Sequence, residues 1–303
     1  MMERKDFKQF CDAVADGISD YLLGFDVEKI RLETVQHNNG VSHTGLVIIL
    51  RGESYAPSIY LEAFYERYKA GVEMEEIFSM LSGQYGAIRK KMEGQGSFTV
   101  DIEKMEQCVF LRLVNFEKNR EILKDCPYIP FHDMAITFRY LVQEDENGIA
   151  SALIHNSVLE QSDLTLEQLY RCAKENTMRI FPPFVKRLDH FLQERFPDEM
   201  GYPEQPGLFI LSNRQFIYGA TMILYREILE ELAEKTESDF YIIPSSVNEV
   251  LIYLADETAD RVMLETTLRE VNAYMVSKMD FLSDEIYFYD KKRGIIVSEM
   301  LDE

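Results

Sequence analysis

Hydrophobic and polar residues follow two different periods along this chain, and both periods recur from one end to the other. Apolar residues recur every three or four positions over residues 5–23 and again over 74–92, which predicts two amphipathic helices. Runs rich in β-branched residues at 27–37 and 41–52 flank an Asn-Asn-Gly segment at 38–40. That arrangement predicts a β-hairpin.

The rest of the chain mixes the two patterns without a regular β-α-β alternation. We therefore predict an α+β fold with mixed, mostly antiparallel sheets and packed helices. The predicted helices lie at 59–71, 116–123, 166–176, 184–196, 226–236 and 261–276. The predicted strands lie at 109–115, 134–143, 149–156, 208–213, 220–225, 240–244, 250–255 and in a closing hairpin at 285–298.

The domain organisation has two candidate boundaries in a chain of 303 residues, which exceeds the usual size of one domain. Residues 94–97, Gly-Gln-Gly-Ser, form a short flexible break. Residues 196–207 hold three prolines, two glycines and three acidic residues. We expect an N-terminal helix, hairpin and helical pair at 1–95, a central α+β region at 96–197 and a C-terminal α+β region at 198–303. One composite unit is the alternative.

The charge balance limits the classes of partner. Lysine and arginine number 32 against 53 aspartate and glutamate residues, which gives a net charge of −21. Such a field repels phosphate backbones and anionic lipid surfaces, so no nucleic-acid partner and no membrane are expected. The four cysteines are scattered without a Cys-x-x-Cys pair, as is typical of reduced core residues. With no signal-like N-terminus and no long apolar run, we expect the protein in the cytoplasm.

Familiar catalytic motifs are absent from the sequence. It contains no Gly-x-Ser-x-Gly elbow, P-loop, Gly-x-Gly-x-x-Gly turn, His-Glu-x-x-His or kinase signature. These absences exclude motif-bearing enzymes more firmly than they exclude catalysis. The sequence thus leans against an enzyme and implies no cofactor and no catalytic residue.

Two histidines, His37 and His43, flank the predicted hairpin turn. A two-residue loop would place His43 opposite Gln36, with the imidazoles on opposite faces, whereas a three-residue loop would pair His43 with Val35 and put both imidazoles on one face. The register is open at this point. Because no third ligand has an obvious spacing, no metal site is expected.

Polar turns at strand ends supply the remaining candidates for a binding site. They are Asn213, Arg214, Ser245, Ser246 and Asn248. Their support is their position, since strand ends and loops are where site residues tend to be displayed.

The turn at 244–249 also has a structural interpretation. Ser246 and Glu249 have the spacing of a capping box, so we predict that Ser246 caps one turn and that a strand follows from 250. Pro244 cannot donate a ladder hydrogen bond and should end the preceding strand. This interpretation leaves Ser245 without a structural role.

A resemblance to a protein family rests on six segments taken together: NNGVSHTGLVI, PSIYLEAFYERYKAG, GIASALIHN, PGLFILSNR, SDFYIIPSSVNEV and LSDEIYFYD. The chain resembles an uncharacterised domain-of-unknown-function family of acidic cytosolic proteins from anaerobic gut bacteria, often found among mobile-element genes. The resemblance implies no known activity or cofactor, and it allows residues 196–207 to be an internal loop. In the family pattern the position of Asn248 is commonly a histidine, so its absence here weakens an acid–base role.

Two functional hypotheses follow. The first is a cytosolic binding or interaction protein, linked to mobile-element biology, whose partner is an unknown protein or small molecule. It rests on the missing motifs and on 17 tyrosines and 19 phenylalanines, which suit interfaces as well as cores. The alternative is an enzyme of unfamiliar type, a hydrolase, that uses the polar turns at 213–214 and 245–248.

Overall fold

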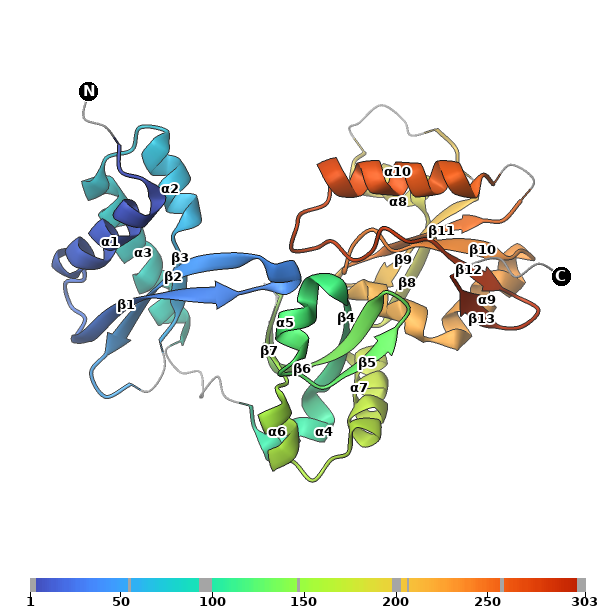
Figure 1. The fold of residues 1–303 in the computed structure, drawn as a ribbon, viewed down its shortest axis with the longest axis horizontal. Helices are drawn as coiled ribbons and strands as arrows, with labels where there is room; N and C mark the ends of the chain where they lie inside the picture. Colours follow the sequence, from blue (N-terminus) through green and yellow to red (C-terminus); the bar gives the residue numbers. More distant parts are fainter. Residues whose placement is uncertain are drawn as a thin grey trace. The chain divides into compact units, whose positions relative to one another are not determined.

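The computed structural model describes residues 4–53, 56–92, 100–145, 148–197, 203–205, 207–256 and 259–298. The chain forms two compact units, Met1–Ser97 and Phe98–Glu303 (Figure 1). Helices are combined with three sheets whose strand pairs are antiparallel, so the fold is α+β as predicted. The predicted break at 94–97 lies outside the described residues.

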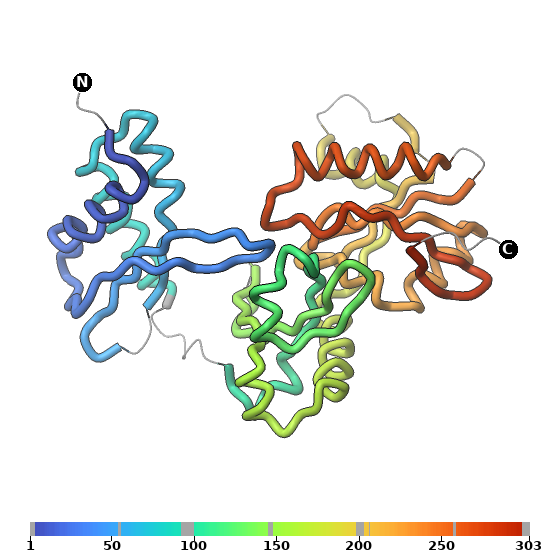
Figure 2. The backbone as a smooth tube through the Cα atoms, viewed as in Figure 1, coloured from blue at the N-terminus to red at the C-terminus, as the bar shows by residue number. Residues whose placement is uncertain are grey.

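In the described part of the N-terminal unit, three α-helices pack on a three-stranded sheet of order β1-β2-β3. Asp6 begins the first helix by accepting a hydrogen bond from the Gln9 backbone N–H at 2.8 Å. Figure 2 shows the β1–β2 hairpin extending away from these helices. The elements are α1 (Phe7–Gly17), β1 (Val27–Gln36), β2 (Ser42–Leu50), β3 (Ser58–Tyr60), α2 (Glu62–Lys69) and α3 (Met74–Met92).

The hairpin has the longer of the two possible loops. His43 is paired with Val35, and residues 38–40 form the turn, with Asn39 in the left-handed region at φ 60°. Both imidazoles therefore lie on one face of the hairpin. The segment at 59–71, predicted as one helix, starts with strand β3, which pairs with β2 before α2 begins.

The C-terminal unit contains two sheets. In the first, β6 (Met134–Asp145) pairs with β4 (Val109–Asn115) on one side and with β5 (Tyr128–Phe131) and β7 (Gly148–Leu153) on the other. The second has the order β13-β12-β10-β11-β9-β8. Its strands are β8 (Pro183–Arg187), β9 (Leu208–Asn213), β10 (Phe240–Ile243), β11 (Val250–Leu254), β12 (Tyr287–Asp290) and β13 (Ile295–Val297).

Seven α-helices are described around these sheets. Among them, α7 covers the edge of β4, where the Thr177 hydroxyl accepts a hydrogen bond from the Leu111 backbone N–H at 2.9 Å. The helices are α4 (Met105–Cys108), α5 (Arg120–Leu123), α6 (Asn156–Gln161), α7 (Leu166–Ile180), α8 (Leu188–Arg195), α9 (Arg226–Thr236) and α10 (Arg261–Tyr274).

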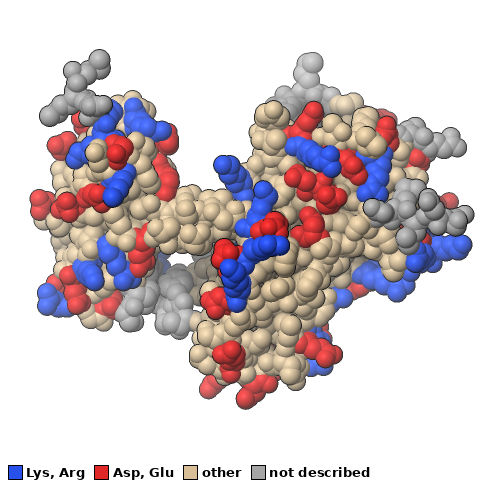
Figure 3. Space-filling view, in the orientation of Figure 1, with Lys and Arg blue, Asp and Glu red and all other residues tan. Residues whose placement is uncertain are grey.

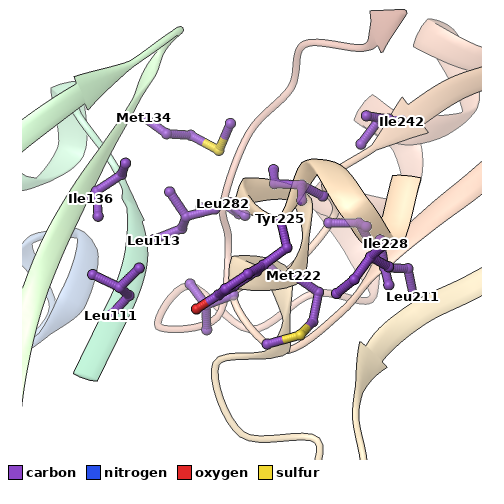
Figure 4. Close-up of a cluster of buried hydrophobic side chains, with 14 of the residues drawn as sticks. Leu111, Leu113, Met134, Ile136, Leu211, Met222, Tyr225, Ile228, Ile242 and Leu282 are labelled. Carbon is purple, nitrogen blue, oxygen red and sulfur yellow. The ribbon is translucent and has the colours of Figure 1, made fainter. Parts of the chain in front are cut away.

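Alternation along β10 gives the six-stranded sheet two apolar faces. Tyr241 and Ile243 pack with Leu268 of α10, whereas Phe240 and Ile242 face the main core of the unit. Figure 4 shows this main core, where side chains of the four-stranded sheet meet side chains of the six-stranded sheet and of the segment before α9. The labelled residues are Leu111, Leu113, Met134, Ile136, Leu211, Met222, Tyr225, Ile228, Ile242 and Leu282.

Two predicted elements are wrong in type. The helix predicted at 184–196 begins as strand β8, because Val185 pairs with Leu211 of β9, and only its second half is helix α8. The strand predicted at 220–225 lies in a 3₁₀ helix, Gly219–Leu224, that is almost entirely buried. A segment buried on all sides has no hydrophobic period from which its type can be inferred.

Residues on both sides of the predicted boundary at 196–207 belong to the C-terminal unit. Strand β8 lies before this segment and β9 after it, and the two strands pair directly. Much of the segment lies outside the described residues. Phe98–Glu303 is one of the two compact units of the chain.

Two further expectations were that the cysteines are reduced core residues and that the chain has no membrane-spanning segment. All four cysteines are free, and burial raises the pKa of the Cys11 and Cys126 thiols to about 11. These two thiols therefore stay protonated at neutral pH. Within the described ranges, no helix is both long enough and apolar enough to cross a membrane.

Candidate functional site

Two of the predicted polar turns meet at one end of the six-stranded sheet. The loop after β9 and the turn before β11 are neighbours because Leu211 pairs with Val250. The Ser212 hydroxyl donates a hydrogen bond to the backbone carbonyl of Asn248 at 2.7 Å, and the Ala220 N–H donates to the carbonyl of Val247 at 3.2 Å. The fold thus brings residues 213–220 and 246–248 together.

Asn213 shapes the first of these turns. Its side chain is fully buried, its amide nitrogen donates to the Ile217 carbonyl at 2.7 Å, and its amide oxygen accepts from the N–H groups of Gln215 and Ile217. An asparagine that bonds its own following backbone in this way fixes a turn. Arg214 beside it is exposed, and its backbone N–H donates to the Pro182 carbonyl at 3.0 Å.

Ser246 caps the second turn, as predicted. Its hydroxyl oxygen accepts hydrogen bonds from the backbone N–H groups of Asn248 at 3.0 Å and Glu249 at 3.3 Å, and its hydroxyl donates to the Glu249 carboxylate at 2.6 Å. Strand β10 ends at Ile243, directly before Pro244, and β11 begins at Val250. The prediction of one capped turn followed by a strand is confirmed.

Ser245 points to a different part of the unit. It is 9% exposed and lines a cleft of about 560 Å³ between α10 and the sheet, with Ile243, Leu251 and Leu268 among its apolar walls. The five predicted residues therefore do not form one site. Asn213, Ser246 and Asn248 lie together, while Arg214 and Ser245 lie apart from them.

Asn248 connects its turn to an aromatic side chain that the sequence did not single out. Its amide oxygen accepts a hydrogen bond from the Tyr218 backbone N–H at 3.2 Å, and its amide nitrogen lies 3.5 Å from the Asp280 carboxylate. Tyr218 has left-handed backbone angles, φ 53° and ψ 29°, which are uncommon for a bulky residue. The next residue, Gly219, tolerates no side chain, because a Cβ there would lie 2.4 Å from the Asn248 carbonyl oxygen.

The Tyr218 ring lies beneath two arginines of the four-stranded sheet. Arg112 of β4 is opposite Thr137, and Arg139 is two residues further along β6, so both arginines are on the same face. The guanidinium carbon of Arg112 lies 4.8 Å from the centre of the Tyr218 ring, and that of Arg139 lies 5.7 Å from it. We refer to Arg112, Arg139 and Tyr218 as the arginine–tyrosine cluster.

The two guanidinium groups differ in their hydrogen bonds. Arg139 donates to the hydroxyl of Ser151 at 2.9 Å and to its carbonyl at 2.7 Å. The Nε atom of Arg112 is buried and, among the described residues, has no hydrogen-bond acceptor. Neither arginine forms an ion pair with a carboxylate in the described part of the chain.

Burial lowers the pKa of Arg112 from 12.5 to about 10. Tyr218 and, less strongly, Asp280 raise the pKa, whereas the neighbouring Arg139 cation lowers it further. At neutral pH Arg112 is still protonated, so the cluster carries two positive charges on one partly buried face. A planar guanidinium binds carboxylate and phosphate groups through paired N–H donors. The arrangement is therefore suited to binding an anion.

Sequence reasoning missed all three residues of this cluster, although one signal was present. Arg112 and Arg139 each interrupt an otherwise apolar strand, Val-Phe-Leu-Arg-Leu-Val-Asn at 109–115 and Met-Ala-Ile-Thr-Phe-Arg-Tyr at 134–140. A charged residue inside a buried strand requires a partner or a function. Nothing in the sequence showed that the Tyr218 ring would lie against both arginines.

A second polar cluster in this unit has its hydrogen bonds satisfied internally. Asp133 accepts a hydrogen bond from the Ser283 hydroxyl at 2.8 Å and another from the Tyr287 hydroxyl. Burial raises the pKa of Tyr287, which keeps the phenol protonated as a donor. Both carboxylate oxygens are thus used to hold the start of β6 against β12, which is a structural role.

Comparison with known proteins gives a family but no activity. No curated protein and no solved structure matches the chain. A model for a family of unknown function (DUF5688) matches residues 7–291, which include the whole arginine–tyrosine cluster. The expected membership of a family without known function is confirmed at that level. The chain belongs to this family of unknown function, DUF5688.

Proposed function

We propose that the protein is a binding protein whose arginine–tyrosine cluster holds the anionic group, a phosphate or carboxylate, of a small molecule or a partner protein. The observation that carries the proposal is Arg112, a protonated and partly buried guanidinium without a carboxylate partner among the described residues. A buried cation without a counter-ion is unfavourable by itself. A bound anion would offset that cost.

The overall charge strengthens the argument. In a chain of net charge −21, acidic side chains are the more numerous, yet none forms an ion pair with Arg112 or Arg139 in the described ranges. On the face drawn in Figure 3, acidic and basic side chains are interspersed, without one continuous acidic stripe. Recognition of an anion at a local pair of arginines is compatible with this mixed surface.

The hydrolase alternative has less support from the geometry. Asn213 and Ser246 use their side chains to hold their own turns, and Asn248 is an amide that cannot act as a general base. Ser245 keeps a hydroxyl at the cleft beneath α10, but no histidine lies among the cleft residues that the structure describes. The alternative therefore depends on Ser245 and on the exposed side chain of Arg214.

The cellular location and the class of partner are part of the same proposal. The resemblance of the sequence favours the cytoplasm of an anaerobic gut bacterium and a link with mobile elements. A partner that is neither a membrane nor a nucleic acid fits the negative charge.

The experiment titrates the full chain with inorganic phosphate, pyrophosphate and succinate at low ionic strength. Isothermal titration calorimetry measures the binding of each anion. We expect at least one of these anions to bind, and Arg112→Gln to weaken it by about tenfold to a hundredfold, since hydrogen bonds to charged groups contribute about 1.5–3 kcal/mol each. Arg214→Gln is the matched control, because Arg214 is an exposed arginine outside the cluster.

A second variant separates a binding role from a structural one. Arg112→Met removes a desolvated charge and keeps much of the side-chain volume, so its melting temperature should be no lower than that of the wild type. A clear loss of stability in Arg112→Met, together with unchanged anion binding in Arg112→Gln, would show that Arg112 is structural and would overturn the proposal.

A further inference from the structure

The N-terminal unit holds a second group of titratable side chains near the tip of the β1–β2 hairpin. The imidazole rings of His37 and His43 lie 4.8 Å apart, measured between ring centres. The ring of Tyr60, from the neighbouring strand β3, lies 5.1 Å from His37 and 5.2 Å from His43. We refer to His37 and His43 as the histidine pair.

Both histidines present a ring nitrogen without a protein partner. His37 Nε2 and His43 Nδ1 are buried, and neither makes a hydrogen bond to the described residues. The same holds for Oε2 of Glu62. Buried polar atoms without a partner are rare in folded proteins, and several of them in one place indicate a ligand, an ion or ordered water.

The separation of the rings fits coordination of one ion by both imidazoles. A metal–nitrogen bond of about 2.0–2.1 Å and a tetrahedral angle place two bound imidazole ring centres roughly 5 Å apart. The observed 4.8 Å is close to that value. The hairpin register produces this geometry, because Val35 rather than Gln36 lies opposite His43.

We propose that the histidine pair binds a divalent transition-metal ion, such as Zn²⁺ or Ni²⁺, through one nitrogen of each imidazole, with water at the other coordination positions. Among the described residues, no group of three or more His, Cys, Asp or Glu side chains could hold a metal ion. The protein therefore supplies two ligands. Imidazole nitrogens prefer these borderline metals to hard cations such as Mg²⁺.

Glu62 is placed to support this site without being a ligand. One carboxylate oxygen accepts a hydrogen bond from the Thr44 backbone N–H at 2.6 Å, which fixes the group. The other oxygen makes no hydrogen bond to the described residues, and the proposal assigns it to metal-bound water.

The test is calorimetric titration of the full chain, free of any polyhistidine tag, with ZnCl₂ and with NiCl₂. We expect one ion bound per chain and a higher melting temperature in its presence. His37→Ala and His43→Ala should each weaken binding by at least about tenfold, and Glu62→Gln should weaken it by about tenfold, the lower end of the range for groups that contact ligands rather than metal.

Controls distinguish this site from other metal-binding groups. The variant His190→Ala lacks an exposed histidine of α8. It should bind the ion as tightly as the wild type does. MgCl₂ should not compete with Zn²⁺. Circular dichroism confirms that each variant is folded. The proposal is overturned if a folded double variant, His37→Ala with His43→Ala, binds Zn²⁺ and Ni²⁺ as tightly as the wild type, or if the wild type binds neither ion.

Discussion

In the two polar turns, side chains form hydrogen bonds mainly with backbone N–H and carbonyl groups. Asn213, Ser246 and Asn248 bond to N–H or carbonyl groups within or between the turns, and Ser212 adds a hydroxyl to the carbonyl of Asn248. Buried backbone groups need such partners. These contacts hold Tyr218 in its left-handed conformation, and Tyr218 in turn contacts both arginines.

Substitution of the capping serine tests this role. Ser246→Ala leaves the N–H groups of Asn248 and Glu249 without their acceptor, so the free energy of unfolding should fall by about 1 kcal/mol. Chemical denaturation measures the change. Ser157→Ala, at an exposed position of α6, should leave the stability unchanged. Anion binding altered in Ser246→Ala without any loss of stability would contradict the structural role.

At the scale of elements, Asp189 joins the end of β8, the start of α8 and the segment before β9. Arg187 is paired with Asp189, and Asp189 also accepts hydrogen bonds from the backbone N–H groups of His190 at 2.8 Å and Gln205 at 3.1 Å. The hydrogen bond from Arg187 and those backbone donors lower the pKa of Asp189 from 3.8 to about 2. The ionised form is thus favoured in the folded state.

The lowered pKa predicts a pH dependence of stability. A carboxyl group whose pKa is lower in the folded state contributes stability above its unfolded pKa, and this contribution is lost as the pH falls through the folded pKa. Asp189→Asn should therefore have a lower melting temperature than the wild type at neutral pH, with the difference shrinking between about pH 4 and about pH 2. Melting curves across this range give the measurement. Asp163→Asn, an exposed position, should show no such trend.

At the scale of the whole molecule, each unit has a core of its own. The N-terminal core is built from residues between Phe7 and Ile88, and the main core of the second unit is built from residues between Val100 and Ile296. A unit with its own core can fold alone. The arginine–tyrosine cluster and the histidine pair lie in different units, so the two proposals can be tested separately.

A fragment of residues 98–303 tests this independence. We expect it to be folded, with a cooperative thermal transition and the anion affinity of the full chain, because the arginine–tyrosine cluster is built only from its residues. Circular dichroism and calorimetry give the two readouts. A fragment that lacks a cooperative transition would show that the second unit depends on the first.

Much of the local structure was predictable because it depends on near neighbours in the sequence. Helical spacing and a capping box mark α7, a turn of three residues marks the β1–β2 hairpin, and Ser246 with Pro244 marks the turn between β10 and β11. Each of these signals acts over a few residues. Strand β8 and the 3₁₀ helix at 219–224 were mistaken because pairing with β9 and complete burial, rather than local pattern, decide them.

By itself, then, the sequence determined the α+β class, most element positions, the capped turn at Ser246 and the strong negative charge. Only the tertiary structure decided that Arg112 and Arg139 share a face over Tyr218, that Ser245 lies apart from Ser246, and that His37 and His43 face each other. Periodicity and caps are fixed by neighbours in the chain, whereas the sites depend on strand register and on which strands lie side by side. Register puts His37 and His43 on one face, and sheet packing brings Tyr218 to Arg112, which is more than a hundred positions away in the sequence.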